Sequence, residues 1–329
     1  MARRALVSGA NGFVGAHVAR VLLQSGREVR AMARGASDMR ALEGVECETV
    51  VADLRDPDSI ERAVAGCDEV FHVAADYRLW VPDEAPMYAA NVDGTRNIIA
   101  ASLRARVSRI VYTSTVGALG GGGREDSPVS ISEMIGPYKR SKFLAERAAL
   151  DAARAGAPIV IVNPSTPIGP LDYKPTPTGR IVVDFLNRRI PAYIDTGLNL
   201  VCVEDVAHGH LLAAERGRIG EKYILGGENL TLKQMLARLG QIAGLPAPKF
   251  RAPWIAAYAF ALAGEAIART ITHRAPRASL VEVRMARKKM FFDSGKARAE
   301  LGYTAAPVDE GLARAIKFFR EIGAAPAAA

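Results

Sequence analysis

The chain has 329 residues, of which 49% are hydrophobic and 24% are charged, and its formal net charge is +8. Its mean hydropathy of +0.06 is that of an ordinary globular protein and excludes a disordered or fibrous chain. The length suffices for one compact unit or two lobes, since a domain usually has about 100–200 residues.

The predicted elements of the first half alternate between short apolar strands and helical patterns. Such alternation is typical of a parallel sheet with helices on both faces. The segments in chain order are 5–8 as a strand, 14–25 as a helix, 28–33 and 50–52 as strands, 59–65 as a helix, 69–74 as a strand, 91–105 as a helix and 109–114 as a strand. We therefore predict an α/β fold, a Rossmann-type doubly wound parallel sheet.

The second half predicts a smaller, mostly helical C-terminal substrate lobe. Strand-like segments at 159–162 and 200–203 continue the sheet, and they enclose a proline-rich stretch that favours loops. Beyond residue 227 the pattern is helical, with 230–243 and 252–268 as helices. We predict a dinucleotide-binding domain of residues 1–163 plus 199–226, and a substrate-binding lobe of residues 164–198 plus 227–329.

Three glycines predict a nucleotide site at the first strand-to-helix turn. Gly9, Gly12 and Gly15 follow the first strand and open the first helix. Glycine permits the tight turn and the close approach of a pyrophosphate, while the helix N-terminus supplies amide donors to the anion. Purely structural glycines are the alternative, but the position within the alternating pattern favours dinucleotide binding.

The residues after the second and third strands bear on which dinucleotide binds. An NAD enzyme usually places a carboxylate at the end of the second strand, where this chain has Arg34. A guanidinium there attracts a 2′-phosphate, so NADP is preferred over NAD, although Arg34 is also consistent with a plain surface arginine. Asp53 and Leu54 are candidates for contacting the adenine, with a simple turn as the alternative.

Tyr138 and Lys142 form the spacing Y-x-x-x-K at the start of a predicted helix, which puts both side chains on one face. An ammonium beside a phenol favours the phenolate, so we expect the pKa of Tyr138 to lie below its ordinary value of about 10. The strand at 110–115 ends in hydroxyl side chains, at the edge of a parallel sheet where ligands approach.

These features together resemble the extended short-chain dehydrogenase/reductase family. The segments that carry the resemblance are the glycine turn, Asp53–Leu54, residues 72–75 (HVAA), 91–95 (NVDGT), 112–115 (YTST) and 138–142, continuing through Asn163–Pro164 and 203–206 (VEDV). The resemblance implies that Tyr138 is the general acid/base, that Lys142 supports it, and that Thr115 is the catalytic hydroxyl, with Ser114 as second choice.

The candidate cofactor-binding residues combine the glycine turn with the positions implied by this resemblance. They are Gly9, Asn11, Gly12, Phe13, Val14, Gly15, Arg34, Asp53, Leu54, Ala74, Ala75, Thr113, Ser114, Tyr138, Lys142 and Pro164. The candidate substrate contacts follow the fourth strand or lie in the proline-rich stretch, and each has a plain loop anchor as its alternative. They are Asp76, Tyr77, Trp80, Asn163, Thr178 and Arg180.

Within the family, the chain resembles the bacterial hopanoid-associated sugar epimerases, which are themselves similar to dihydroflavonol reductases. The segments concerned are 72–80 (HVAADYRLW), 163–169 (NPSTPIG), 175–180 (PTPTGR) and 195–200 (DTGLNL). The resemblance implies hydride transfer at a sugar-like or other hydroxyl or carbonyl carbon, on a nucleotide-sugar or a hopanoid-linked sugar. Arg34 favours the alternative, an NADPH-dependent carbonyl reductase. A non-catalytic nucleotide sensor on the same fold is a third reading.

The distribution of basic residues and one apolar segment bear on the partners of the protein. The Lys and Arg residues are scattered, apart from the run at 284–289, so we expect a small-molecule substrate and no nucleic acid. The apolar segment 252–268 is too short to span a bilayer and predicts a buried or amphipathic helix, with membrane-surface association as the less favoured reading. A homodimer would be usual for the family.

Three widely spaced cysteines predict neither disulfides nor a metal site, and the N-terminus shows no signal-peptide pattern. We therefore expect a cytoplasmic protein without a metal.

Overall fold

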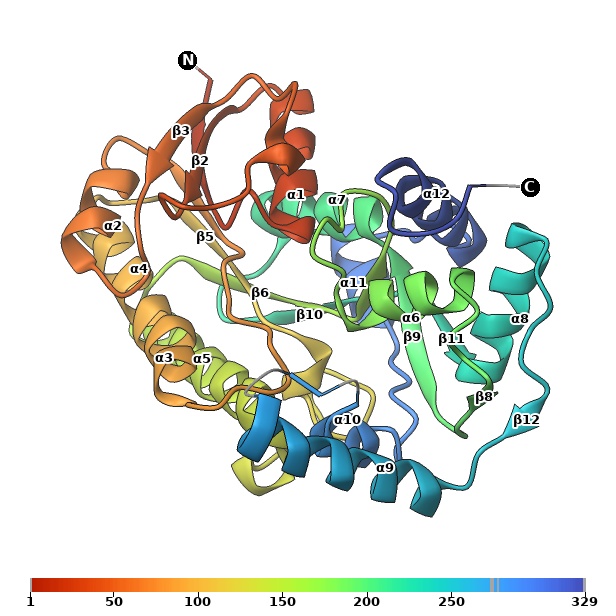
Figure 1. The fold of residues 1–329 in the computed structure, drawn as a ribbon. Coiled ribbons are helices and arrows are strands. Elements are labelled where there is room, and N and C mark those ends of the chain that lie inside the picture. The colour runs from red at the N-terminus through yellow and green to blue at the C-terminus, as the bar shows by residue number, and fades with distance from the viewer. Residues whose placement is uncertain (1, 273–274, 277, 328–329) are drawn as a thin grey trace.

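The computed structural model describes residues 2–272, 275–276 and 278–327. At its centre lies a seven-stranded sheet in the order β10-β6-β5-β4-β1-β2-β3, in which every pairing is parallel (Figure 1). The strands are β1 (Arg4–Ser8), β2 (Glu28–Ala33), β3 (Glu48–Val51), β4 (Glu69–His72), β5 (Arg109–Thr113), β6 (Ile159–Pro164) and β10 (Lys222–Leu225). This order confirms the predicted Rossmann-type parallel sheet.

Helices cover both faces of the sheet because successive strand residues point to opposite sides. Val7 and Val111 belong to one buried core, while their neighbours Leu6 and Ile110 belong to the other. The first core is covered by α1 (Phe13–Gln24), α7 (Val203–Arg216) and α11 (Gly295–Leu301), and the second by α2 (Pro57–Val64), α4 (Gly94–Arg104) and α5 (Gly136–Arg154). Burial on both faces explains the unbroken apolar runs of the strands.

A third core holds the smaller lobe, which contains helices and two small sheets. Its elements are β7 (Thr166–Ile168), α6 (Pro177–Leu186), β8 (Ala192–Tyr193), β9 (Gly197–Cys202), β11 (Glu228–Thr231), α8 (Leu232–Ala243), β12 (Phe250–Arg251) and α12 (Val308–Glu321). Residues 297–303, which we assigned to the lobe, pack in the first core of the sheet. The division into domains stays a prediction.

The remaining elements border the site or the outer surface. They are η1 (Arg40–Leu42), α3 (Ala85–Tyr88), η2 (Ala89–Asp93), η3 (Val116–Ala118), η4 (Ile131–Glu133), α9 (Trp254–Ile267), η5 (Ala268–Thr272) and α10 (Leu280–Met285). Of these, α9 runs along the lower margin of the molecule in Figure 1, with α10 beside it.

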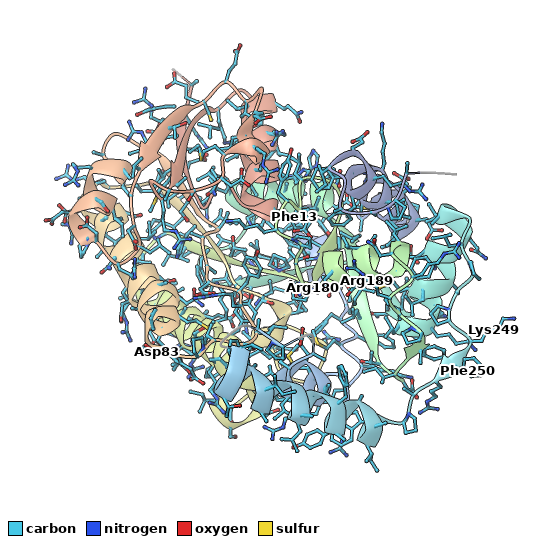
Figure 2. The ribbon with its side chains drawn as sticks, viewed as in Figure 1. Phe13, Asp83, Arg180, Arg189, Lys249 and Phe250 are labelled. Carbon is cyan, nitrogen blue, oxygen red and sulfur yellow. The ribbon has the colours of Figure 1, made fainter. Side chains whose placement is uncertain are left out.

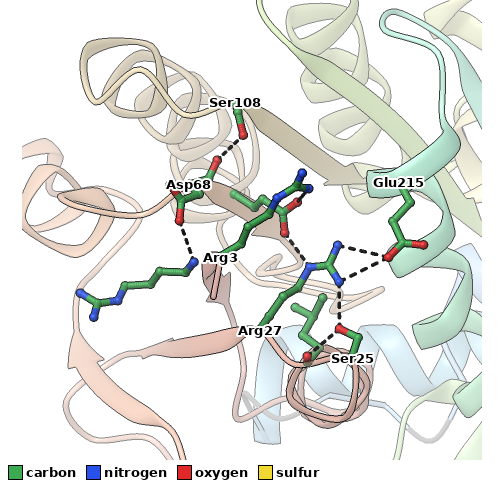
Figure 3. Close-up of polar contacts among 9 residues, drawn as sticks. Arg3, Ser25, Arg27, Asp68, Ser108 and Glu215 are labelled. Atoms are coloured by element: carbon green, nitrogen blue, oxygen red, sulfur yellow. Dashed lines mark hydrogen bonds and ion pairs between the residues drawn. The ribbon is translucent and has the colours of Figure 1, made fainter. Parts of the chain in front are cut away.

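A buried ion-pair network ties the elements together at the amino edge of the sheet (Figure 3). Glu69, at the start of β4, has a side chain only 1% exposed, and it accepts from Arg27 Nε at 2.8 Å and from Arg3 Nη1 at 3.1 Å. Arg27 also lies 3.3 Å from Glu215 of α7. The network therefore joins the starts of three strands to a covering helix, on the edge opposite the strand ends that carry the candidate site.

We expect Glu69→Gln to lower the free energy of unfolding by about 3 kcal/mol, because it removes the buried carboxylate from the buried Arg27 guanidinium and leaves only the half-exposed Glu215 beside it. The matched control is Asp151→Asn, which removes an ion pair whose side chains are 67% and 66% exposed and should cost at most about 1 kcal/mol. Urea unfolding at pH 7 measures both. Equal losses in the two variants would contradict a structural role for the network.

Candidate active site

The turn after β1 is built from glycine because backbone approaches it from two sides. Gly9 has a φ of +67°, and a Cβ there would lie 2.8 Å from the Cα of Ala74. A Cβ on Gly15 would lie 2.1 Å from the carbonyl oxygen of Gly9. Gly12 precedes α1, whose N-terminus has no side-chain cap. The turn therefore brings the amide groups of a helix N-terminus to the carboxyl edge of the sheet, an arrangement suited to an anion.

A chain of buried hydrogen bonds holds residues 73–75 against this turn. Ser8 Oγ accepts from the amides of residues 73 and 74, so it donates to His72 Nδ1 at 2.8 Å. His72 therefore carries its proton on Nε2, which donates to Thr95 Oγ1 at 3.0 Å. Burial lowers the pKa of His72 to about 3 and keeps the ring neutral. These hydrogen bonds to Ser8 thus fix the backbone that leads into Ala74 and Ala75, which line the turn.

Asn91 connects this segment to the helix of the candidate tyrosine. It lies in the π-helical turn η2, accepts from the amide of Asp76 at 2.7 Å and donates to the carbonyl of the same residue at 2.9 Å. It also donates to Ser141 Oγ, which donates to the carbonyl of Tyr138. The sequence analysis did not predict the role of Asn91 in joining these two segments, and the only sequence signal for it is the 91–95 motif.

The candidate adenosine contacts lie at the ends of β2 and β3. Arg34 follows β2 and is exposed. Hydrogen bonds from Arg55 lower the pKa of Asp53 to about 2, and the charge of Arg34 acts in the same direction. Leu54 is buried against Gly94 of α4, where a Cβ would lie 2.6 Å from the leucine Cβ. Arg30, within β2, is not exposed like Arg34: it pairs with Glu48 and donates to backbone carbonyls at the end of α2.

Three other candidates lie just before α1 or in its first turn. Asn11 donates to the carbonyl of Asp38 at 3.1 Å, so its amide is already engaged. Phe13, at the start of α1, and Arg180, on α6, lie in the central part of Figure 2, well away from the rim where Lys249 and Phe250 lie. Val14 follows Phe13 and packs on the first core.

The candidate proton-transfer residues meet at the start of α5. Tyr138 and Lys142 lie one helical turn apart, and Lys142 Nζ donates to the carbonyl of Thr113, at the end of β5, at 2.7 Å. The Thr115 hydroxyl is hydrogen-bonded to Tyr138 and accepts from the amide of Gly117. Ser114 Oγ is buried and has no partner among the described residues. The geometry therefore brings Thr115, and not Ser114, to the phenol.

The pKa of Tyr138 differs from the value expected from its spacing to Lys142. Burial raises its pKa to about 12, and only the Thr115 hydroxyl opposes this. Burial also lowers the pKa of Lys142 to about 7, partly offset by the carboxylate of Glu146. The expected lowering of the tyrosine pKa was wrong because burial disfavours the phenolate more than its surroundings favour it, and the ammonium is engaged by a carbonyl.

A second layer of buried polar residues supports the strand ends. Asn163 is fully buried and donates to Glu146 Oε2 at 2.7 Å and to the carbonyl of Thr115 at 3.1 Å. Thr113 Oγ1 lies 2.8 Å from Nε2 of His210, whose pKa burial lowers to about 4. Asn163, predicted as a substrate contact, therefore lies behind Thr115. Sequence reasoning missed Glu146 and His210, which no spacing pattern distinguishes from ordinary helix residues.

The other candidate substrate residues are only partly brought together. Tyr77 is 43% exposed, and the charge of Arg180 acts on its phenol, so these two share one region. Asp76 is paired with Arg78 at 2.5 Å. Trp80 has a buried indole N–H without a partner among the described residues. Thr178, at the start of α6, is 6% exposed.

Pro164 lies at the buried end of β6. Over the described residues, no group of three or more His, Cys, Asp or Glu side chains is arranged to hold a metal ion.

Comparisons with known proteins agree with this geometry. Residues 5–226 match the NAD dependent epimerase/dehydratase family. A protein of Synechocystis, provisionally named a dihydroflavonol 4-reductase, is 45% identical over 326 residues, which cover 96% of this chain and 94% of that protein. Sterol demethylase protein B of Methylococcus capsulatus is 35% identical, with 97% and 98% of the two chains covered.

A solved structure of a nucleoside-diphosphate-sugar epimerase from Pseudomonas aeruginosa has the same fold. It superposes with a TM-score of 0.81 at 31% identity and covers 98% of this chain and 99% of its own. Relatives that match over nearly the whole length leave no doubt that the chain is an enzyme dependent on a nicotinamide dinucleotide. The protein belongs to the NAD dependent epimerase/dehydratase family, the extended branch of the short-chain dehydrogenases and reductases.

Proposed function

We propose that this enzyme is an NADPH-dependent reductase of a carbonyl group on a small organic substrate. The observation that carries the proposal is Arg34, which is exposed at the end of β2, where NAD enzymes usually have a carboxylate. A cation at this position attracts the 2′-phosphate that distinguishes NADPH from NADH. Cellular reductions commonly draw on NADPH, so the residue favours net reduction over epimerisation.

The residues present fit a dinucleotide. The turn at Gly9 and Gly15 is a backbone cradle that a Cβ would fill, and it presents the uncapped N-terminus of α1 to a pyrophosphate. The adenosine end would lie against Arg34, Asp53 and Leu54. The nicotinamide end would lie among Ala74, Ala75, Thr113, Ser114, Pro164 and the helix of Tyr138. When bound, NADPH supplies the hydride.

The protein's own part in the reaction is to place and move a proton. A pKa of about 12 keeps the Tyr138 phenol protonated at neutral pH, as a proton donor to a carbonyl oxygen must be. The Thr115 hydroxyl lies beside the phenol and would orient the same oxygen. Lys142 lies one turn along α5, and its protonated form would favour the phenolate that remains after the transfer.

A second candidate is a sugar epimerase, favoured by the likeness to the Pseudomonas aeruginosa epimerase at 31% identity. On this reading the substrate would be a nucleotide-sugar or a hopanoid-linked sugar, and the cofactor would be regenerated within each turnover. Two relatives instead carry names that concern a flavonol and a sterol, which favours an apolar substrate for this chain. The hopanoid role, a cytoplasmic location and a homodimer stay predictions.

Cofactor preference is the first test of the proposal. Nucleotide-free protein should bind NADPH about tenfold more tightly than NADH or better, and Arg34→Ala should remove that preference while leaving NADH binding unchanged. Arg62→Ala, an exposed arginine on α2, is the matched control and should keep the preference. Fluorescence titration measures all six affinities, those of wild type and the two variants for NADPH and for NADH. Wild-type protein that binds NADH as tightly as NADPH would instead support the epimerase.

Tyr138→Phe tests the proton donor. The variant should lose about 10²–10⁴-fold in kcat, since the hydroxyl is removed while the ring remains packed. Its affinity for NADPH should stay within about threefold of wild type, because the pyrophosphate turn is untouched. Steady-state turnover with a carbonyl substrate and the titration above give both numbers. Retained turnover would remove Tyr138 from the mechanism.

A further inference from the structure

One face of α9 is both apolar and exposed. Ile255, Phe260, Leu262 and Ile267 are 76%, 61%, 51% and 49% exposed, and Phe250, just before the helix, is 77% exposed. The exposed positions between them are all alanine, at 256, 259, 263 and 266. Their spacing puts them on one side of the helix. Exposed apolar surfaces of this continuity mark binding sites on soluble folds.

The polar groups of α9 point the other way, toward the protein. The indole N–H of Trp254 donates to the carbonyl of Val283 at 2.9 Å, and Glu265 accepts from the amide of Leu280 at 2.8 Å. Ala261 and Glu265 are the buried residues of the helix. The helix is therefore fixed on α10 with its only carboxylate inward and its apolar side chains outward, the reverse of an ordinary surface helix.

Cations lie close to α9, one just before the helix and three on the side that faces α10. Lys249 lies beside Phe250 on the outer rim in Figure 2, and Arg284, Arg287 and Lys288 are exposed on or just after α10. A cavity of about 620 Å³ between α9 and α10 is lined by Ile135, Trp254, Tyr258, Arg284, Arg287 and Lys288, with no carboxylate among them. The guanidinium of Arg287 lies 4.8 Å from the centre of the Trp254 ring. The cavity can therefore take an anionic group beside an apolar one.

We propose that the exposed face of α9 docks on the surface of an anionic lipid bilayer, with lipid phosphates at the cations of the adjoining cavity. An apolar helix face flanked by Lys and Arg has the two components of interfacial membrane binding. A second copy of the chain would cover the apolar side chains but would bring the same cations together, which charge complementarity disfavours. Among the described residues, no helix is long and apolar enough to cross a membrane.

Docking would place the active site beside the lipid. Val281 of α10 packs against Gly136, where a Cβ would lie 2.7 Å from the valine side chain, two residues before Tyr138. Ile135 itself lines the cavity. The surface thus adjoins the start of α5, and it gives the enzyme access to amphiphilic substrates held in a membrane. This inference does not depend on the direction of the reaction or on the cofactor preference.

Co-sedimentation of the full chain with vesicles is the test. Vesicles of phosphatidylcholine with 30% phosphatidylglycerol should bind the protein about tenfold more tightly than pure phosphatidylcholine, and salt at about 0.5 M should remove most of the difference. The double variant Phe260→Ser/Leu262→Ser should lose about tenfold in partition, because it removes two inserting side chains.

The control double variant is Leu103→Ser/Ile219→Ser, which changes residues 47% and 54% exposed on other parts of the surface and should bind like wild type. Both double variants should retain wild-type NADPH binding, which separates a failure of docking from a failure of the proposed function. Arg284→Gln/Arg287→Gln should reduce the preference for anionic vesicles while leaving the weak binding to neutral ones.

Three outcomes would overturn the proposal. If the protein binds neither kind of vesicle and sedimentation velocity shows a dimer that Phe260→Ser/Leu262→Ser dissociates, the face is an interface between copies of the chain. If the protein binds no vesicles and is a monomer at all concentrations, the face has no lipid partner. Equal binding of wild type and the α9 variant would also contradict it, since another surface would then carry the contact.

Discussion

The contact between the glycine turn and the end of β4 is the constraint on which the rest of the site depends. Gly9 and Gly15 bring three backbone segments closer than any side chain would allow. The chain of Ser8, His72 and Thr95 fixes the position of β4 in that contact without using a charge. The N-terminus of α1, the backbone after β4 and the strand ends therefore share one rigid frame.

Burial then determines the chemistry of the groups placed on that frame. Lys142 is buried and Tyr138 is half-buried, so the lysine titrates near neutrality and the phenol keeps its proton. The groups that hold them come from other elements: Thr113 at the end of β5 accepts from Lys142, and Asn91 of η2 reaches the helix through Ser141. Site geometry is thus a property of the packed sheet and helices together, and no single motif contains it.

Helix α9 reverses the usual arrangement of polar and apolar side chains on a surface helix. The helix turns its carboxylate toward the protein and its large apolar side chains outward. Exposing those side chains costs free energy in water, which docking on lipid would recover. The candidate nucleotide site thus lies at the carboxyl edge of the central sheet, while α9 lies at the lower margin of the molecule (Figure 1).

The sequence by itself determined the parallel sheet, the glycine turn and the placement of Tyr138 and Lys142 one turn apart on a helix, because local spacing alone carries those signals. Tertiary structure decided which hydroxyl meets the phenol: Thr115 acts on Tyr138, whereas the Ser114 hydroxyl is buried without a partner among the described residues. It also decided the pKa of Tyr138, the place of Asn163 behind Thr115 and the outward face of α9. Burial is a long-range property, set by residues far away in the chain, and no spacing of neighbours encodes it.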